Sequence, residues 1–176
     1  MSVRLLFGLL QSAVLLLVAI AAHAEPTAKD IKVMSKTLGF VHLPGGSTKL
    51  AIVYDPANVA SQKSANDLQA LMGGSFKAGA TDLAVVLVPL ADLSKQNDVG
   101  VFYAVDGLGA SAHAVADAAK AAHAPCLTDD MDLVRDGTCA IGVKADPKLQ
   151  ILVNKKVTDS DGLTFDPAFT MLITEI

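Results

Sequence analysis

Three histidines are the side chains best suited to acid–base or metal chemistry in the region that follows the N-terminal segment. They are His42, His113 and His123. The chain contains no HxxxH or HExxH pattern, which would let a helix present two histidines to one metal ion. His113 and His123 are ten residues apart, so they face different sides of a helix. We therefore predict exposed histidines, and expect neither a metal site nor a cofactor.

The segment around Gly107 is the next candidate for chemistry. Residues 109–113, GASAH, lack the second glycine of the GxSxG turn that exposes a hydrolase serine. Gly107 and Gly109 stand between an apolar run and an alanine-rich segment, where helix amides could hold an anion. The third glycine of the dinucleotide fingerprint is missing, which favours an ordinary turn. No catalytic residue is predicted, and the chain is expected not to be an enzyme.

Two cysteines, Cys126 and Cys139, enclose an acidic segment. Its acids are Asp129, Asp130, Asp132 and Asp136. They lack the ordered spacing and the distal glutamate of a calcium-binding EF-hand loop, so a solvated loop is expected. An oxidising compartment would pair the two thiols as a disulfide, whereas the cytosol would leave them free.

The first 24 residues indicate the compartment. Arg4 precedes an apolar run over residues 5–22, and Ala22-His23-Ala24 is a small-x-small cleavage site. We expect a Sec signal peptide over residues 1–24 and a periplasmic mature protein over residues 25–176, without a membrane span. An uncleaved anchor is the alternative. Removing Arg4 changes the net charge from −4 to −5, so no basic surface for nucleic acid is implied.

The mature chain, with about 150 residues, suits one domain. Helices are predicted over residues 27–38, 61–72, 111–122 and 166–174. Strands are predicted over residues 49–54, 83–89, 99–105, 126–128, 138–143 and 148–153, with 83–89 at the centre of the sheet. This alternation predicts a single α/β domain with a mixed, mainly parallel sheet, helices on both faces and a C-terminal hairpin.

Ligands of such sheets bind at the carboxyl ends of the strands. The residues that follow two of the predicted strands form the candidate ligand or anion site. They are Asp55, Asn58, Asp106, Gly107 and Gly109.

Several segments resemble, in order, the YfiR family of periplasmic proteins. Residues 40–44, FVHLP, are similar to the family's FVxWP, with Leu43 in place of its tryptophan. Residues 49–55 and 99–105 are similar to two of its strands. The C-terminal third is similar to the succession LTVSD, GGxIGF, VRFEIN and GLKISSxLLxLA through residues 125–128, 137–143, 149–154 and 162–173.

This resemblance implies a non-enzymatic regulator in c-di-GMP signalling. Such a protein binds the periplasmic part of a membrane-bound signalling protein, a diguanylate cyclase, and restrains it. Regulation by contact requires an exposed apolar surface, and a homodimer is an open alternative. The candidate contact residues, which core packing would explain equally well, are Phe40, His42, Leu43, Phe165 and Phe169.

A second resemblance supports another function. Residues 51–58, AIVYDPAN, are similar to the first strand and turn of ABC-transporter substrate-binding proteins. Those proteins close two lobes around a ligand, and this chain has residues for one. The alternative is therefore a single-lobe protein that binds a small ligand.

Overall fold

One eight-stranded sheet organises residues 26–176, the part of the chain that the computed structural model describes. The predicted signal peptide, residues 1–24, lies outside these residues. The strand order is β2-β3-β1-β4-β5-β6-β7-β8. The strands are β1 (Lys49–Tyr54), β2 (Ser75–Ala78), β3 (Thr81–Pro89), β4 (Val99–Ala104), β5 (Cys126–Thr128), β6 (Ile141–Lys144), β7 (Gln150–Val153) and β8 (Thr174–Glu175).

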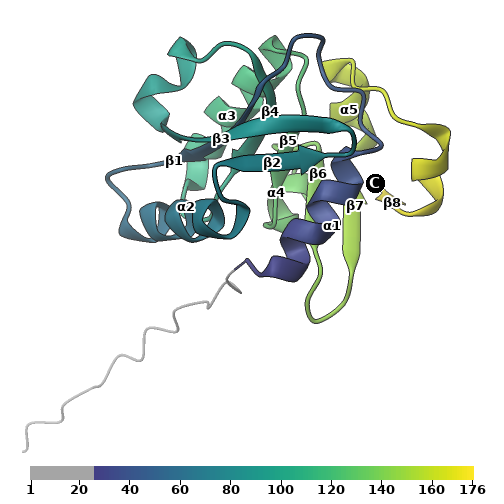
Figure 1. The fold of residues 1–176 in the computed structure, drawn as a ribbon, viewed down its shortest axis with the longest axis horizontal. Coiled ribbons are helices and arrows are strands. Elements are labelled where there is room, and N and C mark those ends of the chain that lie inside the picture. The colour runs from purple at the N-terminus through teal and green to yellow at the C-terminus, as the bar shows by residue number, and fades with distance from the viewer. Residues whose placement is uncertain (1–25) are drawn as a thin grey trace, which may run out of the picture.

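Helices cover both faces of this sheet (Figure 1). On one face lie α1 (Ala28–Leu38) and α2 (Val59–Met72), and on the other lie α3 (Ala112–Ala121), α4 (Met131–Arg135) and α5 (Lys155–Asp161). The short 3-10 helices are η1 (Leu90–Lys95), η2 (Gly109–Ser111) and η3 (Pro167–Met171). The predicted fold class is confirmed. Within the described region, no helix has the length and apolarity that crossing a membrane requires.

The core is built around β1, which pairs in parallel with both β3 and β4. All six residues of β4 are buried, as are the four inner residues of β1. The prediction that residues 83–89 lie at the centre of the sheet is wrong. An additional strand, β2, pairs antiparallel with β3 and forms the sheet edge. Its alternation of exposed and buried residues suits an edge, but four residues are too few for a clear sequence signal.

Side-chain caps set the ends of the first two helices. Thr27 and Asp30 form a capping box at the start of α1. Asn58 accepts hydrogen bonds from the amides of Ala60 and Ser61, so α2 begins at Val59, two residues before the predicted start. The predicted hairpin is confirmed by the antiparallel pairing of β6 with β7. The helix α5, residues 155–161, was not predicted from the sequence.

The C-terminal prediction is wrong in its extent. Instead of a helix over residues 166–174, the chain forms η3 and then β8, which pairs with β7. Phe169 is buried, whereas Leu172 is 55% exposed. Asp166 caps the short η3, and the remaining chain extends along the sheet edge because β7 offers it backbone partners.

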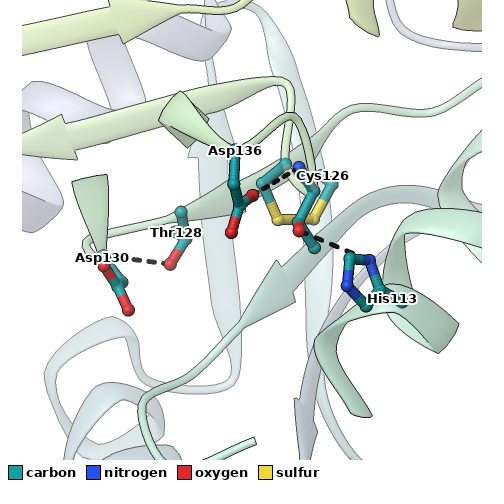
Figure 2. Close-up of a disulfide and its surroundings, with 7 residues drawn as sticks. His113, Cys126, Thr128, Asp130 and Asp136 are labelled. Carbon is teal, nitrogen blue, oxygen red and sulfur yellow. Dashed lines mark hydrogen bonds between the residues drawn. A yellow bond between two sulfur atoms is a disulfide. The ribbon is translucent and has the colours of Figure 1, made fainter. Parts of the chain in front are cut away.

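The predicted disulfide is present between Cys126 and Cys139, with an S–S distance of 2.03 Å and a Cα–Cα distance of 4.9 Å. The prediction of a solvated loop between them is wrong, because residues 131–135 form α4. Met131 and Val134 of α4 are buried against Gly142, where an added Cβ would lie 2.8 Å from atoms of each. Figure 2 shows the bridge between Thr128 on one side and His113 on the other. His113, like His42 and His123, is exposed, as predicted.

Candidate functional site

The parallel pairing of β1 and β4 brings the predicted ligand residues together. The Asn58 side-chain amide donates a 2.8 Å hydrogen bond to the carbonyl of Gly107, which joins the loop after β1 to the loop after β4. The Asp55 carboxylate accepts from the Ala57 amide at 2.8 Å. A Cβ on Gly107, whose φ is +80°, would lie 2.9 Å from the backbone nitrogen of Ser61. The two loops are therefore packed against each other, and the hydrogen bonds of the Asp55 and Asn58 side chains stabilise the turns.

Gly109 does not stand at the start of a long helix, as the predicted anion site requires. It begins the three-residue 3-10 helix η2 rather than α3, and an added Cβ would meet nothing within 4 Å. Asp106 is partly buried and lies near a second acid.

The second acid is Asp129, directly after β5. Burial of the carboxyl, and then the charge of Asp106, raise the pKa of Asp129 to about 6. Its carboxyl interacts with the hydroxyl of Tyr103, whose pKa is raised by burial and by Asp129. Its Oδ1 is buried without a hydrogen-bond partner among residues 26–176. Such a carboxyl can take up a proton or pair with a cationic group near neutral pH.

A hollow of about 380 Å³ opens beside Asp129. Its lining comes from α4 and the β6–β7 turn, and includes Asp130, Asp132, Arg135, Lys144 and Lys148. The described part of the chain holds no cluster of three metal-ligating side chains. Sequence reasoning placed Asp129 among four solvated acids. The signal that distinguishes it is its position immediately after the buried strand 126–128.

The two segments proposed as contact surfaces pack against each other. Val41 and Phe165 form an antiparallel bridge, and the His42 amide donates to the Thr164 carbonyl at 2.9 Å. The ring of Phe169 stacks on Phe40 with centroids 5.5 Å apart, and lies 5.3 Å from the ring of Phe165. Phe169 is fully buried, whereas Phe40, Leu43 and Phe165 are half-buried and His42 is exposed. Core packing therefore accounts for Phe169, and the other four line the surface.

An apolar groove of about 520 Å³ lies beside this aromatic cluster. We call it the α1 groove. It is lined by Val33, Lys36, Thr37, Gly39 and Phe40 from α1 and the segment after it, by Leu149 and Ile151, and by Phe169 and Leu172. Figure 1 shows α1 beside β7, with the yellow C-terminal segment next to them, and the lining residues of the groove come from these parts of the chain.

Sequence reasoning found only the aromatic end of the α1 groove. Val33, Leu149 and Leu172 were not identified as site residues. Val33 carries a signal, because it lies off the helical stripe of Ile31, Met34 and Leu38 that predicts the buried face. Leu149 carries none, because a short β-hairpin does not reveal which neighbour covers its face.

The chain forms a single α/β domain with a mixed, mostly parallel sheet, and comparisons with known proteins show a likeness of this fold. No family model and no curated protein matches this chain. A conserved domain protein from Vibrio cholerae is similar in structure, with 16% identity and a TM-score of 0.61 over 86% of this chain and 60% of that one.

Two further solved structures share this likeness. One is the ABC domain in complex with L-Trp from Streptococcus pneumonia, with 12% identity, a TM-score of 0.54, and coverage of 84% of this chain and 59% of that one. The other is the ligand-free, open structure of CD0873, a substrate binding protein with adhesive properties from Clostridium difficile, with 12% identity, a TM-score of 0.51, and coverage of 83% and 57%. This chain therefore spans at most 60% of the length of these proteins, and the likeness is one of fold.

Proposed function

We propose that this protein is exported to the periplasm and acts by contact, binding the periplasmic part of a membrane-bound signalling protein without turning over a substrate. The observation that carries the proposal is the α1 groove and its rim. Leu149 and Leu172 line the groove and are 53% and 55% exposed. Large apolar side chains gathered around a groove are typical of a surface that a partner covers.

The groove has a firm base. The aromatic cluster and the bridge between Val41 and Phe165 hold the chain on both sides of the groove in place. A base that is ordered before binding loses little conformational freedom when a partner arrives, which favours affinity.

The resemblance to the YfiR family supports a membrane-bound diguanylate cyclase as the partner. Residues 40–44, 149–154 and 162–173 carry part of this resemblance, and each of these segments contributes to the groove or to its base. The regulatory function that follows is to restrain a diguanylate cyclase through this contact.

Capture experiments with groove variants test the proposal. The mature protein, immobilised, is incubated with membrane proteins extracted from its own cell, and the bound proteins are identified. We expect one membrane-bound signalling protein to be retained by the wild type and lost with the double variant Leu149→Asp/Leu172→Asp. Val59→Asp is the matched control, because Val59 is 82% exposed at the start of α2, away from the groove. Retention of the same proteins by the groove variant would contradict the proposal.

A second candidate function is a single-lobe protein that binds a small ligand with a cationic group. The hollow beside Asp129 and the fold likeness to substrate-binding proteins favour it. A screen of small amines and amino acids by thermal unfolding separates the two functions. Ligand binding at this hollow would raise Tm in a way that Asp129→Asn removes and Leu149→Asp/Leu172→Asp preserves.

A further inference from the structure

We infer that the segment which occupies the α1 groove is an acidic amphipathic segment of the partner protein. Its apolar side lies in the groove, and its carboxylates face Lys29, Lys32 and Lys36, which we call the lysine row. The inference rests on the proposed function, since it specifies the chemistry of the partner for the same groove.

The lysine row follows from the geometry of α1. Positions 29, 32 and 36 are spaced by three and four residues, so the three side chains lie along one side of the helix. All three are exposed, and Lys36 also lines the groove. The face of α1 directed into the core carries Asp30, Met34, Thr37 and Leu38. A segment seated in the groove would therefore lie alongside the lysine row.

The lysine row is distinguished from the other cations by its position, with three lysines on one side of one helix, next to the α1 groove. Several basic side chains elsewhere are matched by a nearby acid: Lys63 with Asp67, Lys77 with Asp82, Lys95 with Asp92, Arg135 with Asp132 and Lys155 with Asp159. Within residues 26–176, Lys29, Lys32 and Lys36 form no ion pair. The same is true of Lys49, Lys120, Lys144, Lys148 and Lys156, but these lie on different elements and do not form a row. Three cations along one side of a helix attract the carboxylates of an acidic segment and orient it.

Charge also distinguishes this partner from other occupants. A second copy in a symmetric groove-to-groove contact would place two lysine rows against each other. The apolar N-terminal segment, residues 5–22, contains no acid and follows Arg4. A flat anionic membrane surface would not fill a concave groove. An acidic amphipathic protein segment can fill the groove with its apolar side and pair its carboxylates with the lysine row.

Synthetic peptides provide the test. A fluorescein-labelled helical peptide with leucines on one face and glutamates on the other is titrated with the mature protein, and its anisotropy is measured. A matched peptide carries lysines in place of the glutamates. We expect the acidic peptide to bind about tenfold or more tightly than the basic one, with an affinity that falls as salt rises.

Three variants locate this preference. Lys29→Glu/Lys32→Glu/Lys36→Glu is expected to abolish or reverse it. Lys77→Glu/Lys120→Glu/Lys156→Glu is the control, because it changes the net charge equally at exposed positions outside the row. Leu149→Asp/Leu172→Asp is expected to remove binding of both peptides. Absence of binding by the acidic peptide up to about 1 mM would overturn the inference.

The remaining outcomes separate the inference from the proposed function. Equal binding of both peptides, lost only with the groove variant, overturns the acidic preference and leaves the groove as the contact surface. Binding that the groove variant leaves unchanged overturns both. Binding to phosphatidylglycerol vesicles that the row variant removes, without a preference between peptides, assigns the row to a membrane surface and overturns the inference.

Discussion

The carboxylate of Asp30 accepts a 2.6 Å hydrogen bond from the backbone amide of Ala145, 115 residues further along the chain. Both residues are buried. Asp30 also accepts from the backbone amide and the hydroxyl of Thr27 at the start of α1. One carboxylate therefore begins α1 and ties it to the β6–β7 hairpin, so that α1 and β7 stand as the two walls of the α1 groove.

Asp30→Asn is expected to lower the free energy of unfolding at pH 7 by about 2 kcal/mol, because charged hydrogen bonds to a buried helix start are lost. Urea denaturation measures this. Asp67→Asn, which breaks an exposed ion pair on α2, is the control and should change stability by less than about 1 kcal/mol. Equal effects of the two variants would show that the Asp30–Ala145 bond does not hold α1.

The same carboxylate predicts a loss of stability in acid. Burial opposes its ionisation, but the hydrogen bonds from Thr27 and Ala145 outweigh burial and lower the pKa of Asp30 below its ordinary value of 3.8. Its stabilisation is present above pH 3.8 and is lost as pH falls through the lower pKa of the folded state. Wild type should therefore lose its advantage over Asp30→Asn in this acidic range. A difference between the two that does not vary with pH would contradict this assignment.

Asp129→Asn is expected to stabilise the protein at pH 7 by about 2 to 3 kcal/mol, the opposite sign. Burial first, and Asp106 second, raise the pKa of Asp129 to about 6, so its ionisation in the folded state costs free energy. Between pH 3.8 and about 6 the folded state binds the extra proton, and stability falls as pH rises. Chemical denaturation across this range measures the decline, which Asp129→Asn should remove.

Asp132→Asn is the matched control for Asp129, because the side chain of Asp132 is 87% exposed. Its pH dependence should follow that of the wild type. A stability decline that survives in Asp129→Asn would mean that another group carries it.

Thr37→Val is expected to leave stability unchanged or raise it by about 1 kcal/mol. The Thr37 hydroxyl is buried beside the α1 groove without a hydrogen-bond partner in the described region, and valine keeps the shape of threonine. Thr37→Ala removes the hydroxyl and also a methyl group, so it should be less stable than Thr37→Val. Thermal unfolding compares the two, and a large loss in the valine variant would reveal a partner for the hydroxyl.

Gly142→Ala is expected to destabilise the protein by about 1 to 3 kcal/mol. Its new methyl group would lie 2.8 Å from the Met131 sulfur and from Val134, so α4 would have to shift. Gly74→Ala is the control, because nothing lies within 4 Å of an added Cβ there. If both variants unfold alike, the segment between the cysteines is not packed on β6.

The sequence predicted those parts of the fold that depend on local pattern. The apolar run of β1 follows from nearby residue types, and the pairing of Cys126 with Cys139 follows from the export signal and the absence of competing cysteines. The caps at Thr27 and Asn58 were not predicted. The acidic segment was misjudged because its four aspartates conceal Met131 and Val134, which are buried only through contact with Gly142.

The site was predictable only in part for the same reason. Phe40 and Phe169 were identified separately, but their stacking depends on the bridge between residues 41 and 165, which no local pattern specifies. Leu149 and Leu172 complete the α1 groove from two other parts of the chain. Local sequence also does not show which buried polar atoms lack a hydrogen-bond partner. The Thr37 hydroxyl and the Asp129 Oδ1 lack one among the described residues because of how distant parts of the chain pack around them.

Capture of the membrane-bound partner by wild type and by Leu149→Asp/Leu172→Asp tests contact through the α1 groove most directly. Circular dichroism first establishes that the variant and the Val59→Asp control are folded. We predict that the signalling protein is retained by wild type and by Val59→Asp, and lost with the groove variant. Retention by a folded groove variant, at the level seen with wild type, would contradict contact through the α1 groove.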